Sequence, residues 1–275
     1  GQTTTIESLS HQGTPGNGWS QDAKLSADGS VIVFASSANN LVPDDTGGTD
    51  IFVRNRAGGA IRRLSTRADG TAAPGAHWHP DISPDVRFVV FSSDATTLVT
   101  PSTTGRHSYL RDRDSDGNGV FDETAGVSLE LISVSTDGVR ANGDSGMPVI
   151  SADGRYVAFH SFATNLVDGD TNNALDVFLR DRVTGTTLRL STGLGGGAGA
   201  GISNVPNISR DGRYVIFQSN APDLVPGDTN ATTDIFRYST VRNVVERVST
   251  SSVGAQLDGG SELGREAVEG PCHPA

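Results

Sequence analysis

The sequence predicts an all-β protein, a β-propeller of four complete four-stranded blades, and three observations lead there. One unit recurs along the 275-residue chain: residues 148–192, PVISADGRYVAFHSFATNLVDGDTNNALDVFLRDRVTGTTLRLST, resemble residues 206–250 and 23–66. A repeat of this length is typical of solenoids, propellers and arrays. Apolar residues within the unit form short alternating or continuous runs bounded by turn residues, which indicates strands. No helical periodicity interrupts them, so tandem four-stranded sheets are the expected architecture.

Within the unit we expect strands at 147–151, 155–160, 176–182 and 187–191 of the third copy. Asp153-Gly154 between the first two strands is a two-residue hairpin signal, because both turn positions must tolerate positive φ. The second copy has Asp85-Val86 there, and a β-branched residue is unfavourable at positive φ. We therefore expect a distorted turn in the second blade.

The expected blades span approximately residues 20–66, 77–136, 146–192 and 204–250 of a single domain covering residues 1–275. Residues 3–10 match the end of a unit and residues 261–270 match its first strand, so they predict the terminal strands of an incomplete fifth blade. Exposed strand edges template association. We expect these strands to bind a protein partner or to self-associate; a chain continuing past Ala275 and a repacked closed four-blade ring are the alternatives.

Composition narrows the class of partner. The formal net charge is −11 with a single lysine, Lys24, which disfavours nucleic acid and anionic membrane surfaces. No apolar run reaches the roughly 20 residues that a membrane helix needs, so membrane insertion is not expected. The only cysteine, Cys272, cannot form an internal disulfide. The acidic composition, rich in Ser, Thr, Asn and Gly, suggests a secreted or periplasmic protein.

An acidic insertion between the third and fourth strands of the second blade is the sharpest chemical signal. Residues 112–123, DRDSDGNGVFDE, carry five carboxylates that repel one another unless a cation screens them. A calcium loop of twelve residues takes oxygen ligands at positions 1, 3, 5, 7 and 12, with glycine at position 6. This pattern predicts a Ca²⁺ site, with a solvated acidic hairpin as the alternative. The expected ligands are Asp112, Asp114, Asp116, Asn118 and Glu123.

A second acidic cluster recurs in the loop joining strands two and three. The third and fourth copies read DGDTNNALD and PGDTNATTD. The candidate residues are Asp170, Asn172, Asp176, Asp228, Asn230 and Asp234. Only Asp45 and Asp50 remain at these offsets in the first copy, and Ser102 and Ser108 replace both acids in the second. Asx side chains often cap turns, so turn stabilisation competes with cation binding as the interpretation.

Two histidines enter the second blade as His77-Trp78-His79. In an extended segment His77 and His79 lie on one face, where two imidazoles could bind a transition metal. A surface or channel-lining pair is the alternative interpretation, because the sequence locates no third ligand.

The units resemble the TolB-like family of propeller repeats, the WD-like repeats with a Pro-Asp signature. The resemblance rests on S-x-D-G-R-Y-V-x-F, then D-[IV]-F and a closing R-[LV]-S-T, and covers residues 20–250. It implies a secreted or periplasmic propeller used mainly for protein contact, and sometimes placed before a serine-hydrolase domain. The sequence has no G-x-S-x-G elbow that would indicate such a hydrolase.

Two classes of function therefore remain. The first is a non-catalytic, calcium-stabilised module for protein binding or self-assembly, because the polar motifs repeat with the blade. The second is a propeller hydrolase or lyase with a site at the channel mouth, for which His77, His79 and His160 with the loop acids are the material. An enzyme needs unlike titratable groups converging in one pocket.

Overall fold

The computed structural model describes residues 4–45, 47–123 and 125–263, and these contain sixteen strands in four antiparallel four-stranded sheets. Blade 1 is β1 (Ser20–Leu25), β2 (Val31–Ser36), β3 (Asp50–Asn55) and β4 (Ile61–Arg63). Blade 2 is β5 (His77–Ile82), β6 (Phe88–Ser93), β7 (His107–Asp112) and β8 (Ser128–Leu131). Blade 3 is β9 (Ser145–Ile150), β10 (Tyr156–Ser161), β11 (Asp176–Asp181) and β12 (Thr186–Arg189). Blade 4 is β13 (Ser203–Ile208), β14 (Tyr214–Ser219), β15 (Asp234–Ser239) and β16 (Val244–Arg247).

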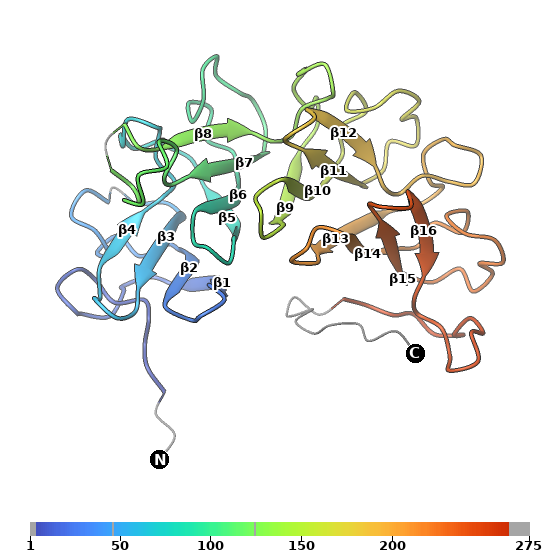
Figure 1. Ribbon diagram of the computed structural model, residues 1–275, viewed down its shortest axis with the longest axis horizontal. Coiled ribbons are helices and arrows are strands. Elements are labelled where there is room, and N and C mark those ends of the chain that lie inside the picture. Colours follow the sequence, from blue (N-terminus) through green and yellow to red (C-terminus); the bar gives the residue numbers. More distant parts are fainter. Residues whose placement is uncertain (1–3, 46, 124, 264–275) are drawn as a thin grey trace.

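The four sheets form an arc around a common axis, with β1, β5, β9 and β13 innermost (Figure 1). Each blade is a simple meander in which successive strands pair. Among the strands described, contacts join successive blades, whereas blades 1 and 4 share no comparable contact and the arc stays open between them. The predicted all-β fold with four complete blades is therefore confirmed. The described residues hold no helix long and apolar enough to span a bilayer.

The hairpin between the first two strands of each blade is built by a serine. In blade 3 the Ser151 hydroxyl donates to Asp153 (2.6 Å) and accepts the Tyr156 N–H (3.0 Å), while Gly154 N–H donates to Ser151 carbonyl oxygen (3.0 Å). In blade 2, Val86 keeps the same backbone bond at 2.9 Å with φ of 63°. The expected distortion of this turn is therefore wrong, since the valine adopts the strained left-handed conformation instead.

Every innermost strand carries a bulge at the same position. The pairing register shifts within each of these strands, next to a residue at positive φ. These residues are Asp22, His79, Met147 and Val205, with φ between 48° and 53°. A bulge inserts one unpaired residue and redirects the following side chains. The alternation expected for an extended 77–79 segment is consequently broken at its last residue.

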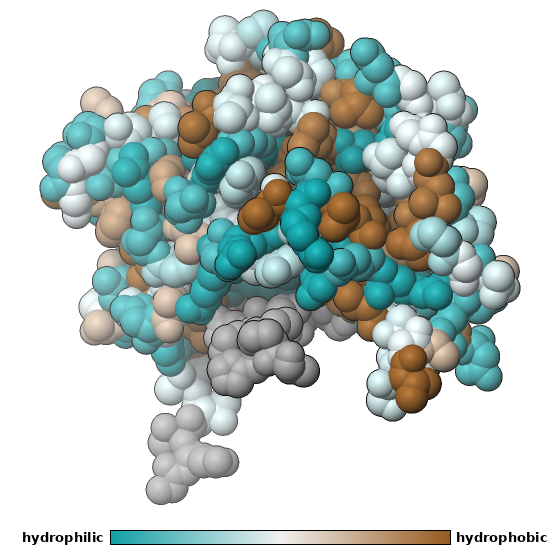
Figure 2. Space-filling model, turned by 45° about the vertical axis from the view of Figure 1, so that its right-hand side comes forward, coloured by the Kyte–Doolittle hydropathy of each residue, from teal (hydrophilic) through white to brown (hydrophobic). Residues whose placement is uncertain are grey.

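The core lies between successive blades. The two central strands of each blade present apolar residues to both faces, and each blade has one central pair of stacked aromatic rings. These pairs are Phe34–Phe52, Phe91–Tyr109, Phe159–Phe178 and Phe217–Phe236, with ring centroids 5.8 to 5.9 Å apart. At the surface, hydrophobic side chains lie in small separate groups among hydrophilic ones (Figure 2).

The described ends of the chain repeat the contacts that hold neighbouring blades together. Arg54 donates to the Leu9 carbonyl (2.9 Å), as Arg111 does to the Thr66 carbonyl (3.3 Å). At the other end, Ser261 N–H donates to Thr233 carbonyl oxygen (2.7 Å), as Ser145 N–H does to Arg106 (2.8 Å). Residues 4–10 hold an isolated bridge instead of a strand, and most of the predicted strand 261–270 lies outside the described residues.

Candidate functional site

The acidic insertion joins β7 to β8, as predicted, and Asp112 accepts the Asp114 N–H at 3.1 Å, but its carboxylate is also engaged outside the loop. This residue ends β7 and is held by two hydrogen bonds of 2.8 Å from Arg87. In blade 3 the same positions hold Asp181 and Arg155, with bonds of 3.0 and 2.7 Å. Because an identical pair occurs in a blade without an acidic loop, the carboxylate of Asp112 belongs to the architecture of the blade.

Asp114 is a buried acid of the loop, and its carboxylate is hydrogen-bonded to the loop backbone. Its side chain is buried, with the residue only 7% exposed, and one oxygen accepts the Gly119 N–H at 3.1 Å. The other oxygen, Oδ1, is buried without a hydrogen-bond partner. A buried carboxylate oxygen left unpaired is costly, because it has lost water without receiving a donor or a cation. Asp114 Oδ1 is therefore the atom of the loop at which a bound cation would be most favourable.

The remaining predicted ligands lie on the same loop. The Asn118 side-chain amide donates to Asp116 (3.0 Å) and to Glu123. These hydrogen bonds group Asp116, Asn118 and Glu123 on the exposed side of the turn. Within residues 4–45, 47–123 and 125–263, no three His, Cys, Asp or Glu side chains converge closely enough to hold a metal ion. The loop carries oxygen ligands of the kind that Ca²⁺ prefers, but the Asn118 NH₂ faces the two carboxylates and the Asn118 Oδ1 accepts the Val120 N–H at 2.7 Å.

The structure is compatible with two registers of the calcium pattern, because Gly117 and Gly119 both have positive φ. Starting at Asp114 instead of Asp112, Asp116 and Asn118 occupy positions 3 and 5, and Gly119, with φ of 83°, is the glycine at position 6. Phe121 then takes position 8. Glu123 falls at position 10, so the register lacks the acid at position 12. The overlapping acids of residues 112–116 concealed this register in the sequence.

The second acidic cluster forms around a buried arginine-carboxylate contact. In blade 3, Asp176 accepts hydrogen bonds from Ser191 and from the Asn172 amide (2.9 Å), while Arg189 lies 3.6 Å from Asp170. Burial raises the pKa of Asp176 to about 6. The structure therefore brings Asp170, Asn172 and Asp176 together and places the positively charged Arg189 beside them. The corresponding group in blade 4 is Asp228, Asn230, Asp234, Arg247 and Ser249.

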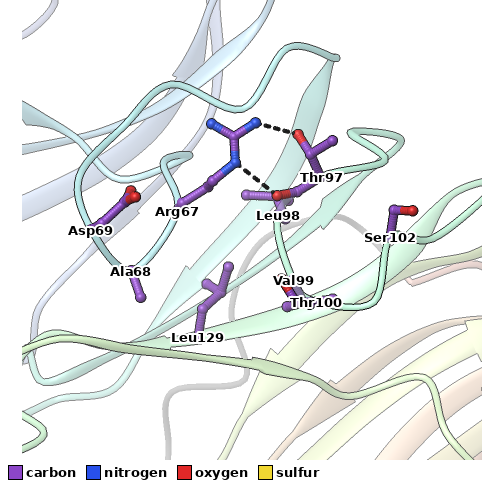
Figure 3. Close-up of a pocket in the computed structure, with 9 residues that line it drawn as sticks. All are labelled: Arg67, Ala68, Asp69, Thr97, Leu98, Val99, Thr100, Ser102 and Leu129. Carbon is purple, nitrogen blue, oxygen red and sulfur yellow. Dashed lines mark hydrogen bonds between the residues drawn. The ribbon is translucent and has the colours of Figure 1, made fainter.

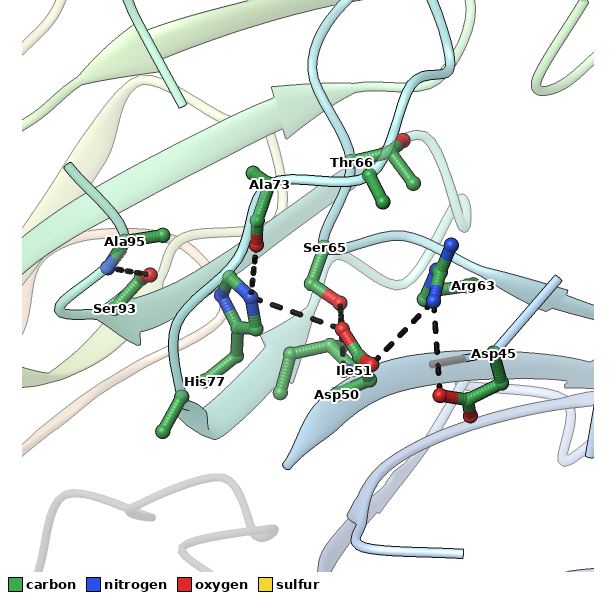
Figure 4. A network of polar contacts seen from close by, with 12 residues as sticks. Asp45, Asp50, Ile51, Arg63, Ser65, Thr66, Ala73, His77, Ser93 and Ala95 are labelled. Carbon is green, nitrogen blue, oxygen red and sulfur yellow. Dashed lines mark hydrogen bonds and ion pairs between the residues drawn. The ribbon is translucent and has the colours of Figure 1, made fainter. Parts of the chain in front are cut away.

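Blade 1 has the same arrangement of an arginine beside two loop acids (Figure 4). Arg63 lies 3.7 Å from Asp45 and 3.6 Å from Asp50, and Ser65 donates to Asp50 at 2.5 Å. The guanidinium lies where a cation bound by the two carboxylates would be. In three blades an arginine of the fourth strand thus balances the loop acids, which favours turn stabilisation over cation binding.

Blade 2 departs from this arrangement through a histidine. His107 pairs with Ser93 in the same register in which Asp50 pairs with Ser36, and its Nδ1 lies 2.9 Å from the Ser133 hydroxyl. His107, and not Ser108, therefore replaces the acid in the second blade. The one-residue error arose because the loop between Ser93 and His107 is one residue shorter than the corresponding loops of blades 3 and 4.

His77 and His79 point to different neighbours. His77 is fully buried, with Nε2 3.3 Å from the Ala73 carbonyl and 3.7 Å from Asp50, and burial lowers its pKa to about 4. His79 lies in the bulge, with Nε2 4.0 Å from Asp22. The expectation that these two imidazoles share one face is therefore wrong. The bulge, which the sequence did not reveal, separates them.

His160 approaches His79 from the third blade. His160 lies on β10 opposite Gly146. A Cβ added to Gly146 would lie 3.2 Å from the Nε2 of His160. Burial, followed by the positive charges of His79 and Arg106, lowers the pKa of His160 to about 4. Asp22 and His79 thus lie on the inner strands β1 and β5, and His160 approaches His79 from β10, the second strand of blade 3.

Two cavities lie between segments of blades 1 and 2. The larger, about 610 Å³, is bounded by Arg67, Asp69, Thr97 and Leu98 (Figure 3). The Arg67 guanidinium donates to Thr97 carbonyl oxygen (3.0 Å) and hydroxyl (2.6 Å), so its charge is used in joining two loops. The smaller cavity, about 320 Å³, has Phe121 of the acidic loop in its wall.

No protein-family model matches this chain, and no curated protein sequence matches it either. Among solved structures it is similar to a putative TolB from Agrobacterium tumefaciens, at 17% identity and a TM-score of 0.49, over 82% of this chain and 63% of that one. A prolyl endopeptidase is 12% identical with a TM-score of 0.48, over 86% of this chain and 30% of that one. A puromycin-hydrolysing peptidase from Mycobacterium tuberculosis is 15% identical with a TM-score of 0.46, over 84% of this chain and 30% of that one. The chain thus spans less than two thirds of each of these proteins, and likenesses this distant do not bear on activity.

Proposed function

We propose that this chain is a non-catalytic, calcium-stabilised propeller module that acts in a secreted or periplasmic setting by protein binding or self-assembly. The observation that carries the calcium part is Asp114, a buried carboxylate with one oxygen lacking any partner. The residues that would hold the ion are Asp114, Asp116, Asn118 and Glu123, all oxygen ligands of the kind hard dications prefer. A bound Ca²⁺ would give the unpaired Oδ1 of Asp114 a positively charged partner.

Calcium titration of chelator-treated protein tests this part directly. We expect isothermal titration calorimetry to show one Ca²⁺ per chain, and Asp114→Asn to abolish that binding. The matched control is Asp137→Asn, at an exposed acid in the linker after β8. No calcium uptake by the wild-type protein, or equal uptake by the Asp114→Asn variant, would eliminate the site.

Two observations support a function in surface contact: the partners of the recurrent acids, and the exposed sheet face of blade 4. The recurrent acids are engaged by Ser and Arg partners of their own blades, which leaves them an architectural role. On blade 4, Ile216 occupies the register of Val33, Val90 and Ala158, which pack against the next blade. A partner sheet can therefore pack on this face of the arc.

Sedimentation velocity over a wide concentration range tests self-assembly. We expect reversible association, weakened by Ile216→Lys and unaffected by Val241→Lys, a change at an exposed hairpin residue of the same blade. A chain that stays monomeric at all concentrations, or an Ile216→Lys variant that associates as the wild type does, would rule out assembly through this face.

A hydrolase or lyase is the second candidate, favoured by one observation. Asp22 on β1, His79 on β5 and His160 on β10 are unlike titratable groups from three successive blades, the kind of groups that acid-base chemistry requires. Turnover of an ester, peptide or glycoside that is lost in His79→Ala would establish it. The absence of turnover across these substrate classes would leave the binding module.

A further inference from the structure

The seam between blades 2 and 3 shows how the repeat normally fills the space between sheets. The ring of Phe88 lies between two guanidinium groups, with Arg87 at 4.9 Å and Arg182 at 5.1 Å from its centroid. Arg182 is fixed by hydrogen bonds to the Gly154 carbonyl (2.6 Å) and to Glu130 (2.8 Å). Stacking of guanidinium groups on an aromatic face is favourable, so ring and arginines form one packed unit.

The seam between blades 1 and 2 keeps the arginine, but the ring beside it, Phe121, comes from the acidic loop and not from the second strand of the blade. Arg113 matches Arg182, because its NH1 donates to Val86 carbonyl oxygen at 2.7 Å across the corresponding hairpin. The position of Phe88, opposite the last residue of the third strand, is occupied in blade 1 by Val31. Replacing the repeat's aromatic residue by valine removes a ring's volume from this seam.

The smaller cavity lies at this seam. It has a volume of about 320 Å³, within the lower range of small-molecule sites. Val31, Val53 and Val86 line it, together with the aliphatic Ala60. Phe121 forms a further wall from the acidic loop, where its ring stacks under Arg113 at 5.0 Å. The cavity is therefore apolar on several sides, with an aromatic ring and a guanidinium beside it.

Asp122 also lines the cavity, but its carboxylate is paired with Arg113 at 2.7 Å, and two further polar side chains, Asn55 and Arg62, can recognise an anion. Arg62 is exposed, and within the described part of the chain NH1 alone of its donor groups is engaged, in a bond of 3.0 Å to the Asp122 carbonyl. The Asn55 side-chain oxygen accepts the N–H groups of Ala57 and Gly58, which leaves its NH₂ as the donor. Guanidinium groups pair with carboxylates in a fixed fork geometry, so Arg62 suits such a ligand.

We propose that this seam binds a planar aromatic group carrying an acidic substituent, such as an aromatic carboxylate. The ring takes the place of the missing repeat aromatic among Val31, Val53 and Phe121, and the carboxylate accepts hydrogen bonds from Arg62. Because Phe121 belongs to the acidic loop, calcium binding and ligand binding are coupled in the same direction; this coupling rests on the proposed calcium site.

Titration with 2-naphthoate, followed by its fluorescence and by saturation-transfer NMR, tests the site. We expect saturable binding of one molecule, and at least tenfold weaker binding to Val31→Phe, which restores the repeat's own aromatic residue and fills the cavity. Val139→Phe, at an exposed linker position, is the matched control and should bind as the wild type does. Equal affinity of a folded Val31→Phe variant, or no binding to the wild type, overturns the proposal.

The acidic substituent is tested separately by 2-naphthamide, which lacks the charge. Arg62→Gln should weaken naphthoate binding severalfold and leave naphthamide unchanged. If the wild type binds naphthamide as tightly as naphthoate, the anion-recognising role of Arg62 is wrong.

Repeating the titration in chelator tests the coupling. A severalfold loss of naphthoate affinity without calcium supports it, and an unchanged affinity refutes it. A protein that takes up no calcium, yet binds naphthoate in a manner sensitive to Val31→Phe, would retain the seam site and lose the proposed calcium function.

Discussion

Replacing Asp112 by asparagine should destabilise the second blade equally with and without calcium. Its carboxylate receives two hydrogen bonds of 2.8 Å from Arg87 and also accepts the Asp114 N–H at 3.1 Å. Burial opposes ionisation, but the bonds from Arg87 hold the pKa of Asp112 below its ordinary value. Asparagine keeps the shape and loses the charge, and its NH₂ group faces a guanidinium that also donates.

The magnitude follows from the matched pair in blade 3. Hydrogen bonds from Arg155 lower the pKa of Asp181 from 3.8 to about 2. A fall of that size corresponds to roughly 2.5 kcal/mol, at 1.36 kcal/mol for each pKa unit. Because a hydrogen bond to a charged group contributes about 1.5 to 3 kcal/mol, we expect Asp112→Asn to cost about 2 kcal/mol. At about 2.1 cal/mol/K of unfolding entropy per residue, a chain of this length would melt roughly 3 to 4 °C lower.

Urea unfolding of wild type, Asp112→Asn, Arg87→Met and the double variant, each in calcium and in EDTA, measures the effect. A double-mutant cycle isolates the pair, and we expect a coupling of about 1 to 2 kcal/mol in both conditions. Asp181→Asn is the control in a blade without the acidic loop and should behave alike. A loss that appears only in calcium would show that Asp112 is an ion ligand, and would refute the assignment to Arg87.

Three further changes test the fold and its titrating groups. Unfolded histidine titrates near pH 6.5 and buried His77 near 4, so the unfolded chain takes up a proton first as pH falls, and this contribution to stability is lost between pH 6.5 and 4. The His77→Ser variant carries the residue found at this position in blades 3 and 4. Between pH 6.5 and 4 its free energy of unfolding should therefore fall by roughly 3 kcal/mol less than that of the wild type, measured by chemical unfolding. Parallel pH profiles of the two proteins would contradict this. Gly143→Ala should destabilise by about 2 kcal/mol or more, because its Cβ would lie 2.8 Å from the Phe162 backbone, whereas Gly195→Ala meets no atom within 4 Å and should stay within about 0.5 kcal/mol by thermal melting. Phe159→Ala, at a fully buried ring between blades 2 and 3, should cost about 3 to 5 kcal/mol in urea, and a loss below 1 kcal/mol would mean that the seam repacks.

The sequence by itself determined the blades, because their signals are local. Strand periodicity and the recurring serine act within a few residues and repeat in every unit, and the Asp-Gly hairpin repeats in all blades but the second. The acidic insertion was also located correctly, since it breaks the repeat between β7 and β8. Fold class and the position of the candidate loop therefore followed from the chain alone.

Tertiary structure decided which acids are available to a ligand. The sequence pattern predicts Asp112 as a calcium ligand, but its carboxylate is hydrogen-bonded to Arg87, which directly precedes β6 and lies 25 residues away in the sequence. The loop acids of blades 1, 3 and 4 likewise meet arginines of the fourth strand, such as Arg63, which sequence offsets do not associate with them.

The bulge of each inner strand was equally invisible, and it separates His77 from His79 while bringing His79 toward Asp22. Local patterns specify backbone conformation, because turn and strand preferences are properties of a few adjacent residues. The partner of a buried charge is set by pairing register and by the packing of one blade on the next, which the chain acquires only when it folds.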